Sequence, residues 1–190
     1  MNIIVSAHLD TVFRDAYACF KDGIFKGSCD NIAGVLAMAL VMHESPGIRI
    51  ELTEDEEMGM QGCRALAKKA SQTDDLFIVI DVCNRSHHWP KTINFTVENF
   101  HRIQWKHIRA ALKPLAKQYR LRPQGEESEA WTFRDLGFAV VECCIPVVGG
   151  IHNLEGWTRG EDMWAVSEAV KLLAEYLGPK NIREIEGEID

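Results

Sequence analysis

The chain has 190 residues, of which 46% are hydrophobic and 26% are charged, and its formal net charge is -7. This size and composition are typical of one soluble globular domain with a sizeable core. The acidic balance and the absence of a basic stripe argue against nucleic acid and anionic membrane as partners.

The expected location is the cytoplasm. The first residues lack the basic region of a secretory signal, and no apolar stretch approaches the roughly 20 residues that a membrane-spanning helix needs. The six cysteines form no CxxC pair, and several lie inside apolar runs. We therefore expect reduced, buried thiols and no contact with a membrane.

Four apolar runs predict strands that are mostly buried on both faces. They cover residues 2–7, 48–53, 76–81 and 138–143. Residues 92–99 instead alternate apolar and polar side chains, which predicts a half-exposed or edge strand.

Helical patterns separate these strands. Residues 31–44 are apolar nearly all round, which predicts a deeply buried crossover helix. Further helices are predicted over 59–70, over 105–119 with a kink at Pro114, and over 161–177.

The alternation of strands and helices predicts an α/β fold, a three-layer sandwich whose central, largely parallel mixed sheet has helices on both faces. We expect one domain over residues 1–178, and residues 179–190 are predicted to be a frayed acidic tail.

Polar residues follow each predicted strand, and in open α/β sheets the carboxyl ends of the strands are where sites form. The residues at this edge are His8, Asp10, Asp30, the acidic run Glu54–Glu57, Asp81 and His152. Carboxylates gathered in this way repel one another unless a cation joins them. Two histidines with at least three carboxylates are a suitable ligand set for one or two divalent metals.

Each of these signals has an ordinary structural explanation when it is taken alone. The His8–Asp10 pair fits a surface turn, Asp30 fits a helix N-cap, the acidic run fits a solvated loop, and His152 fits a loop histidine. Their shared position after predicted strands is what favours a metal site.

The motifs "HLDTV", "DGIFKGSCDNIAG", "DEEMG" and "GIHNLEG", with Asp81 between the last two, occur in this order along residues 3–177. In this the chain resembles the co-catalytic zinc exopeptidases, which include bacterial aminopeptidases, dipeptidases and aminoacylases. The resemblance implies a peptide-bond or amide-bond hydrolase with two divalent metal ions, Zn²⁺ in the first place and Mn²⁺ or Co²⁺ as alternatives.

The resemblance also implies a ligand set. His8 and Asp81 would bind the first metal, Asp30 would bridge both metals, and Glu57 and His152 would bind the second.

Two catalytic roles are implied as well. Asp10 would hydrogen-bond the other ring nitrogen of His8, with Leu9 turned into the core. Glu56 has no ligand role and would be the general base. Relatives often have a cis peptide after the bridging aspartate, here Asp30.

The substrate is less defined than the metal site. A short peptide and an N-acyl amino acid both fit, so a deacylase is the alternative to an aminopeptidase or dipeptidase, and a non-catalytic binding protein is a third reading. The segment between Asp81 and His152 is too short for the lid domain of many relatives, which favours a homo-oligomer that supplies a wall to the site. Weaker candidates for substrate contacts are Glu126, Glu127, Glu129 and the pair His87–His88.

Overall fold

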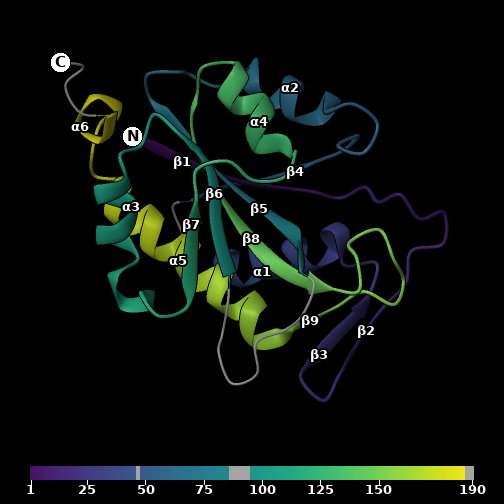
Figure 1. Cartoon of the computed structure of the whole chain (residues 1–190). Coiled ribbons are helices and arrows are strands. Elements are labelled where there is room, and N and C mark those ends of the chain that lie inside the picture. The colour runs from purple at the N-terminus through teal and green to yellow at the C-terminus, as the bar shows by residue number, and fades with distance from the viewer. Residues whose placement is uncertain (46–47, 86–94, 187–190) are drawn as a thin grey trace.

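The computed structural model describes residues 1–45, 48–85 and 95–186 (Figure 1). Its strands are β1 (Asn2–His8), β2 (Ala18–Lys21), β3 (Ile24–Gly27), β4 (Arg49–Thr53), β5 (Asp75–Arg85), β6 (Phe95–His101), β7 (Tyr119–Arg122), β8 (Ala139–Val148) and β9 (Trp157–Arg159). Its helices are α1 (Cys29–Glu44), α2 (Gln61–Ala67), α3 (Trp105–Ala111), α4 (Glu129–Asp135), α5 (Gly160–Leu177) and α6 (Ile182–Glu186), with a 3-10 turn over Lys113–Leu115.

The strands form one mixed sheet in the order β2-β3-β9-β8-β5-β1-β4, and β6 joins β8 and carries β7. Its centre is parallel, because β1 pairs with β4 and β5, and β5 pairs with β8 in the same sense. The pairs of β2 with β3, β3 with β9, and β6 with β8 are antiparallel. The predicted α/β sandwich with a largely parallel mixed sheet is confirmed.

Helices cover both faces of the sheet (Figure 1). Helices α1 and α5 lie on one face, where alternate strand residues such as Val5, Ile78 and Val141 are buried with the apolar side of α5. Helices α2 and α4 lie on the other face, where Phe77 of β5 stacks on Phe133 of α4 with ring centroids 3.8 Å apart. Because strand side chains alternate between the two faces, every second residue of β1 and β5 lies on this second face. The last of these positions on each strand lie at the polar carboxyl edge of the sheet.

The prediction for residues 92–99 is wrong where the structure describes them. Residues 95–98 of β6 are buried on both faces, and the strand pairs with β7 on one side and β8 on the other. The alternation arises because Phe95 and Val97 face the core under α5, whereas Glu98 faces an internal cavity instead of solvent.

Several helix predictions also need correction. Helix α1 is not buried all round, because Leu36 and Leu40 lie on its outer side and are exposed. The helix predicted over 105–119 ends at Ala111, and Pro114 lies in the 3-10 turn that follows.

The C-terminal tail is ordered over residues 182–186. Helix α6 buries Ile182 and Ile185 against the core, and Arg102 forms an ion pair with Glu186. A frayed tail from residue 179 is therefore wrong, because two isoleucines spaced three apart give this short helix an apolar side. Residues 187–190 lie outside the described part of the chain.

Candidate metal centre

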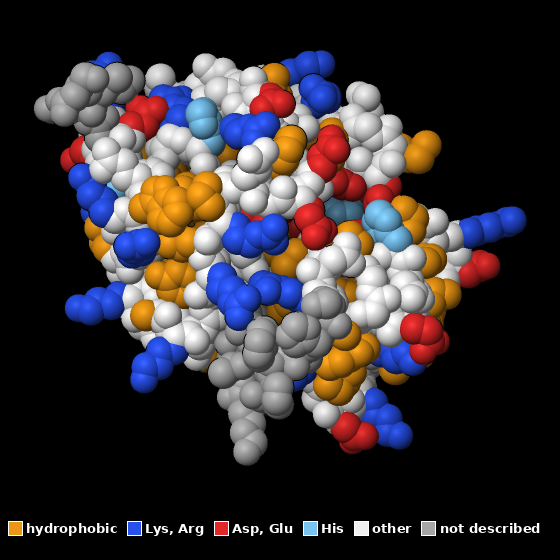
Figure 2. Space-filling view, viewed as in Figure 1, with side chains coloured by type: hydrophobic (Ala, Val, Ile, Leu, Met, Phe, Trp, Pro, Cys, Tyr) orange, Lys and Arg blue, Asp and Glu red, His pale blue; other side chains and the backbone are white. Residues whose placement is uncertain are grey.

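Six of the seven predicted site residues line one cavity of about 380 Å³ at the carboxyl edge of the sheet. His8 is the last residue of β1, Asp30 lies in the first turn of α1, and Asp81 lies within β5, which continues to Arg85. Glu56 and Glu57 lie in the turn after β4, and His152 lies in the turn after β8. Figure 2 shows acidic side chains gathered around histidine at this place.

Asp30 lies between the two histidines. Its Oδ1 is 3.1 Å from Nε2 of His8, and its Oδ2 is 3.1 Å from Nε2 of His152. Asp81 Oδ1 lies 3.5 Å from the same nitrogen of His8, and Glu57 Oε1 lies 3.4 Å from Nε2 of His152. Ligand atoms therefore gather in two neighbouring groups, with one carboxylate facing both.

The six cavity residues also divide into two groups of possible metal ligands, which we call the halves of the centre. In one half, a ligand atom each of Glu56, His8 and Asp81 lies within 4.8 Å of the others. In the other half, Asp30, Glu57 and His152 have the same spacing. The two consecutive glutamates thus diverge, one toward each half of the centre.

Asp10 supports this arrangement from outside the cavity lining. Its carboxylate accepts hydrogen bonds from the backbone N–H groups of Glu56, at 3.2 Å, and Glu57, at 3.1 Å. Nδ1 of His8 faces the backbone carbonyl of Asp10 at 3.1 Å and its carboxylate at 3.5 Å. Asp10 therefore fixes both His8 and the glutamate turn. Leu9 is exposed and not turned into the core.

The donor set fits divalent cations. Because Nδ1 of His8 faces a carbonyl oxygen, that nitrogen carries a proton, and Nε2, which faces the Asp30 and Asp81 oxygens, is the ring nitrogen that a metal would bind. Without a metal, the same carboxylates favour a second proton on Nε2, and a bound cation would take the place of that proton. Asp30 Oδ1 and Glu57 Oε1 are also buried without a hydrogen-bond partner.

Burial and neighbouring charges shift the pKa values of His8 and Glu56. Burial lowers the pKa of His8, but hydrogen bonds and charge from Asp30 and Asp81 outweigh it and raise the pKa to about 12. Burial raises the pKa of Glu56 to about 8, and the nearby carboxylates of Asp81, Glu57 and Asp30 add to this. The carboxylates that stabilise the charged form of His8 would also attract a metal cation.

Local structure holds Asp30 in place. The peptide bond between Asp30 and Asn31 is cis, as the resemblance implied. The Asn31 side chain donates to the carbonyl of Ile80 at 2.8 Å and accepts from the Gly34 N–H at 3.0 Å. The start of α1 is thereby attached to β5 beside Asp81.

Several cavity residues are absent from the predicted set. Glu98 and Glu142 line the cavity, and the alternation along β6 was the one sequence signal for the first of them. Of the weaker candidates for substrate contacts, Glu126 and Glu127 line the cavity, whereas Glu129 lies buried in the first turn of α4. Ser128 caps α4, because its side chain accepts a hydrogen bond from the Ala130 N–H. His87 and His88 lie outside the described residues.

The profile of peptidase family M28 matches residues 1–169 of the chain. Among solved structures, the chain is similar to the aminopeptidase APDkam598 from the archaeon Desulfurococcus kamchatkensis, with a TM-score of 0.70 and 17% identity over 92% of this chain and 55% of that one. The TET1 peptidase of Pyrococcus horikoshii gives a TM-score of 0.65 and 16% identity over 86% of this chain and 53% of that one. An M18-family aminopeptidase from Thermotoga maritima gives a TM-score of 0.60 and 13% identity over 82% of this chain and 47% of that one.

The chain thus spans about half the length of these structures. No sequence among the curated proteins matches the chain significantly. None of the helices in the described part of the chain combines the length and apolarity that a transmembrane helix requires.

Proposed function

Because the chain belongs to peptidase family M28, we propose that it is a metal-dependent exopeptidase that removes N-terminal residues from short peptides. The observation that carries this proposal is the Asp30 carboxylate facing a histidine nitrogen with each of its oxygens, at 3.1 Å in both cases. This arrangement suits a carboxylate that bridges two cations.

The residues present would hold two divalent ions. His8 and Asp81 would bind one, Glu57 and His152 the other, and Asp30 both. Imidazole and carboxylate ligands suit zinc, and they also accept manganese or cobalt. When bound, such ions acidify water and stabilise negative charge that develops on a peptide carbonyl oxygen.

Glu56 is the proposed general base. It lies in the cavity beside His8 and Asp81, and the Asp10 carboxylate fixes its backbone. From this position it would take the proton of the attacking water and deliver it to the departing amine. Asp10 would keep the proton of His8 on Nδ1 and thus leave Nε2 free as a ligand.

The test is Glu56→Gln in the metal-loaded chain, with aminoacyl-4-nitroanilides as substrates. We expect kcat to fall by about 10²- to 10⁴-fold, while metal content stays close to two equivalents by elemental analysis. Glu54→Gln is the matched control, because this exposed side chain is in the same loop. Full activity of Glu56→Gln refutes the assigned base, and loss of one metal equivalent makes Glu56 a ligand instead. Faster hydrolysis of N-acetyl amino acids than of nitroanilides would favour the deacylase reading.

We also propose homo-oligomerisation and a cytoplasmic location. Pyrococcus horikoshii TET1 assembles into a tetrahedron or an octahedral shell, and on this chain Leu36 and Leu40 expose apolar surface one turn apart on α1. The described cysteines are all free thiols, and only Cys19 is exposed, which suits a reducing compartment. Light scattering after size exclusion measures the first proposal, and cell fractionation measures the second.

A further inference from the structure

The cavity continues past the metal ligands along the sheet, toward β6 and β8. Its wall there consists of Glu98, Glu142, Cys144 and, from the loop before α4, Glu126 and Glu127. We call the four glutamates of this wall the acidic recess. Glu98 and Glu142 are cross-strand partners on β6 and β8 and are almost fully buried, whereas Glu126 and Glu127 are exposed at its mouth.

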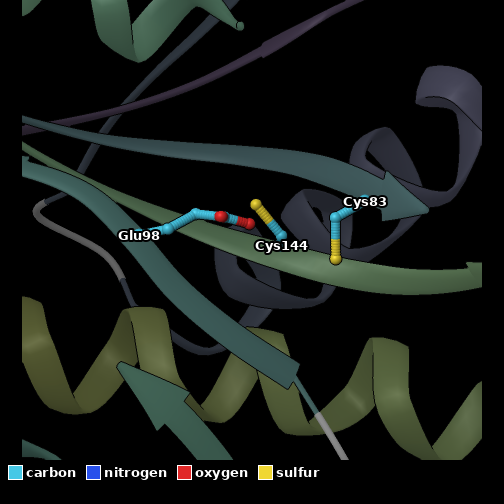
Figure 3. A group of neighbouring side chains, drawn as sticks. All are labelled: Cys83, Glu98 and Cys144. Atoms are coloured by element: carbon cyan, nitrogen blue, oxygen red, sulfur yellow. The ribbon is translucent and has the colours of Figure 1, made fainter. Parts of the chain in front are cut away.

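Glu98 is the least satisfied group of the acidic recess. Its side chain is fully buried, neither carboxylate oxygen accepts a hydrogen bond from an N–H or hydroxyl group, and the Cys144 thiol, a weak donor, lies beside it. Figure 3 shows it extending from β6 across the sheet face toward Cys144. The cation next to it is Arg122, whose Nη1 lies 3.5 Å from Oε2 and whose side chain is half exposed. Glu142, in contrast, accepts a hydrogen bond from the Asn99 side chain.

No lysine or arginine of the described residues lines the acidic recess or the rest of the cavity. Outside the lining, Arg122 lies beside Glu98, and its charge and that of Arg85 favour the ionised form of Glu98. Burial raises the pKa of Glu98, and burial together with the charges of Asp81 and Glu98 raises the pKa of Glu142 well above its ordinary value. A cation bound in the acidic recess would therefore favour the ionised forms of both carboxylates.

The distance from the metal centre decides which cation could reach this wall. Asp81 of β5 pairs with Cys144 of β8, and Cys144 pairs with Thr96 of β6. β6 therefore lies two strands from Asp81, about 10 Å away, and Glu98 lies two residues further along the strand. The α-amine of a bound peptide is one carbon from the carbonyl that would react at the metals, so it stays close to the metal ligands. The ammonium of a lysine, on its four-carbon stem, can reach Glu98.

The direction of the substrate follows from burial. The acidic recess is closed at Glu98 and Glu142, whereas the His152 side chain at the opposite end of the cavity is half exposed. In an exopeptidase the released residue occupies the closed end, and the rest of the peptide leaves through the open end.

We propose that the acidic recess binds the cationic side chain of an N-terminal lysine or arginine, so that the enzyme prefers peptides with a basic first residue. This rests on the proposed function for the position of the scissile bond. Glu98 is the specificity-determining residue, Glu142 lies beside it on β8, and Glu126 and Glu127 add carboxylates at the mouth of the recess.

A third metal ion is the competing occupant. One ligand atom each of Cys83, Glu98 and Cys144 lies within 4.8 Å of the others, and all three residues are buried (Figure 3). Two observations favour the ammonium. Cys83 does not line the cavity, and Arg122 lies beside Glu98, which disfavours a divalent ion more strongly than a monovalent one.

The experiment compares the 4-nitroanilides of lysine and norleucine, which differ only in the terminal ammonium, with the metal-loaded full chain. We expect kcat/KM to be at least about tenfold higher for lysine, because a buried carboxylate loses a charged partner with norleucine. Glu98→Gln should lower this ratio by about tenfold or more, to near one. Glu175→Gln, an exposed acid on α5, is the matched control, and thermal melting checks that both variants fold.

A second measurement separates this inference from the proposed function. Calorimetric titration of the metal-loaded chain with lysinamide and norleucinamide reports binding without hydrolysis. Suppose that neither nitroanilide is cleaved, that lysinamide binds more tightly than norleucinamide, and that Glu98→Gln abolishes this difference. The acidic recess then binds a cationic side chain, and the proposed peptidase function is refuted. Equal cleavage of both nitroanilides, or a lysine-to-norleucine ratio that Glu98→Gln does not change, refutes the proposal for the acidic recess. A third metal equivalent that is lost in Glu98→Gln and in Cys144→Ser also refutes it.

Discussion

The Asp10 carboxylate makes a specific prediction, because one side chain is attached to both halves of the metal centre. It accepts the backbone N–H groups of Glu56 and Glu57 and lies beside Nδ1 of His8. Asp10→Asn keeps the size of the side chain but replaces one acceptor oxygen with an amide that cannot accept either hydrogen bond. The turn that carries the two glutamates then loses one of its two attachments.

The magnitude follows from these two hydrogen bonds. A hydrogen bond to a charged group contributes about 1.5–3 kcal/mol, and the Asp10 side chain is only 23% exposed, so solvent screening is limited. We expect Asp10→Asn to lower the free energy of unfolding by about 2 kcal/mol, which corresponds to a drop in Tm of roughly 4–8 °C for a chain of this length. Metal affinity should fall by about 10- to 100-fold, because the ligands His8 and Glu57 are held less firmly.

The assay combines urea unfolding with competition for zinc against a chromophoric chelator. Asp15→Asn, an exposed aspartate changed in the same way, is the matched control. If Asp10→Asn is as stable as Asp15→Asn and binds zinc equally well, then the hydrogen bonds to Glu56 and Glu57 do not position the site.

Two further predictions concern the helical layer over the site. Phe133→Ala should lower the free energy of unfolding by about 3–5 kcal/mol, since the ring stacks on Phe77 with centroids 3.8 Å apart. In urea unfolding, Phe20→Ala at an exposed position should lower it by less than about 1 kcal/mol. Equal losses in the two variants would contradict the packing argument. Burial raises the pKa of Glu129 from 4.5 to about 7, so its contribution to stability is full below pH 4.5 and lost as pH rises through 7. Glu129→Gln should therefore be about 3 kcal/mol more stable than the parent at about pH 8.5 and equal to it near pH 4.5, as measured by urea unfolding of the metal-free chain; a constant difference across pH would refute the assignment.

The sheet and its two helical layers could be predicted because their signals are local. Continuous apolar runs identified β1, β4, β5 and β8, and these are the strands whose carboxyl edge carries His8, the glutamate turn and His152. Several ordered motifs along most of the chain then predicted the residues that the structure gathers in one cavity.

The missed elements depend on partners far away in sequence. Strands β7 and β9 have only four and three residues, and pairing with β6 and β3, respectively, stabilises them. Helix α4 is a single short segment whose Phe133 is placed by Phe77. Its sequence has the glutamates of a solvated loop, and the burial of Glu129 depends on the sheet beneath it.

The prediction of a half-exposed or edge strand at β6 is wrong for a related reason. A period of two distinguishes the two faces of a strand, but it does not tell whether the polar face meets solvent or an internal cavity. Glu98 faces a cavity, and the pairing of β6 with both β7 and β8 decides this.

That same alternation separates two tasks along one strand pair. Phe95, Val97 and Cys143 point into the core, while Glu98 and Glu142 point into the cavity. With the proposed function, exchanges at the second set would alter which peptides are accepted without disturbing the packing that the first set maintains. Selectivity would then evolve by single changes at every other position, with the proposed metal ligands on β1, β5 and α1 untouched.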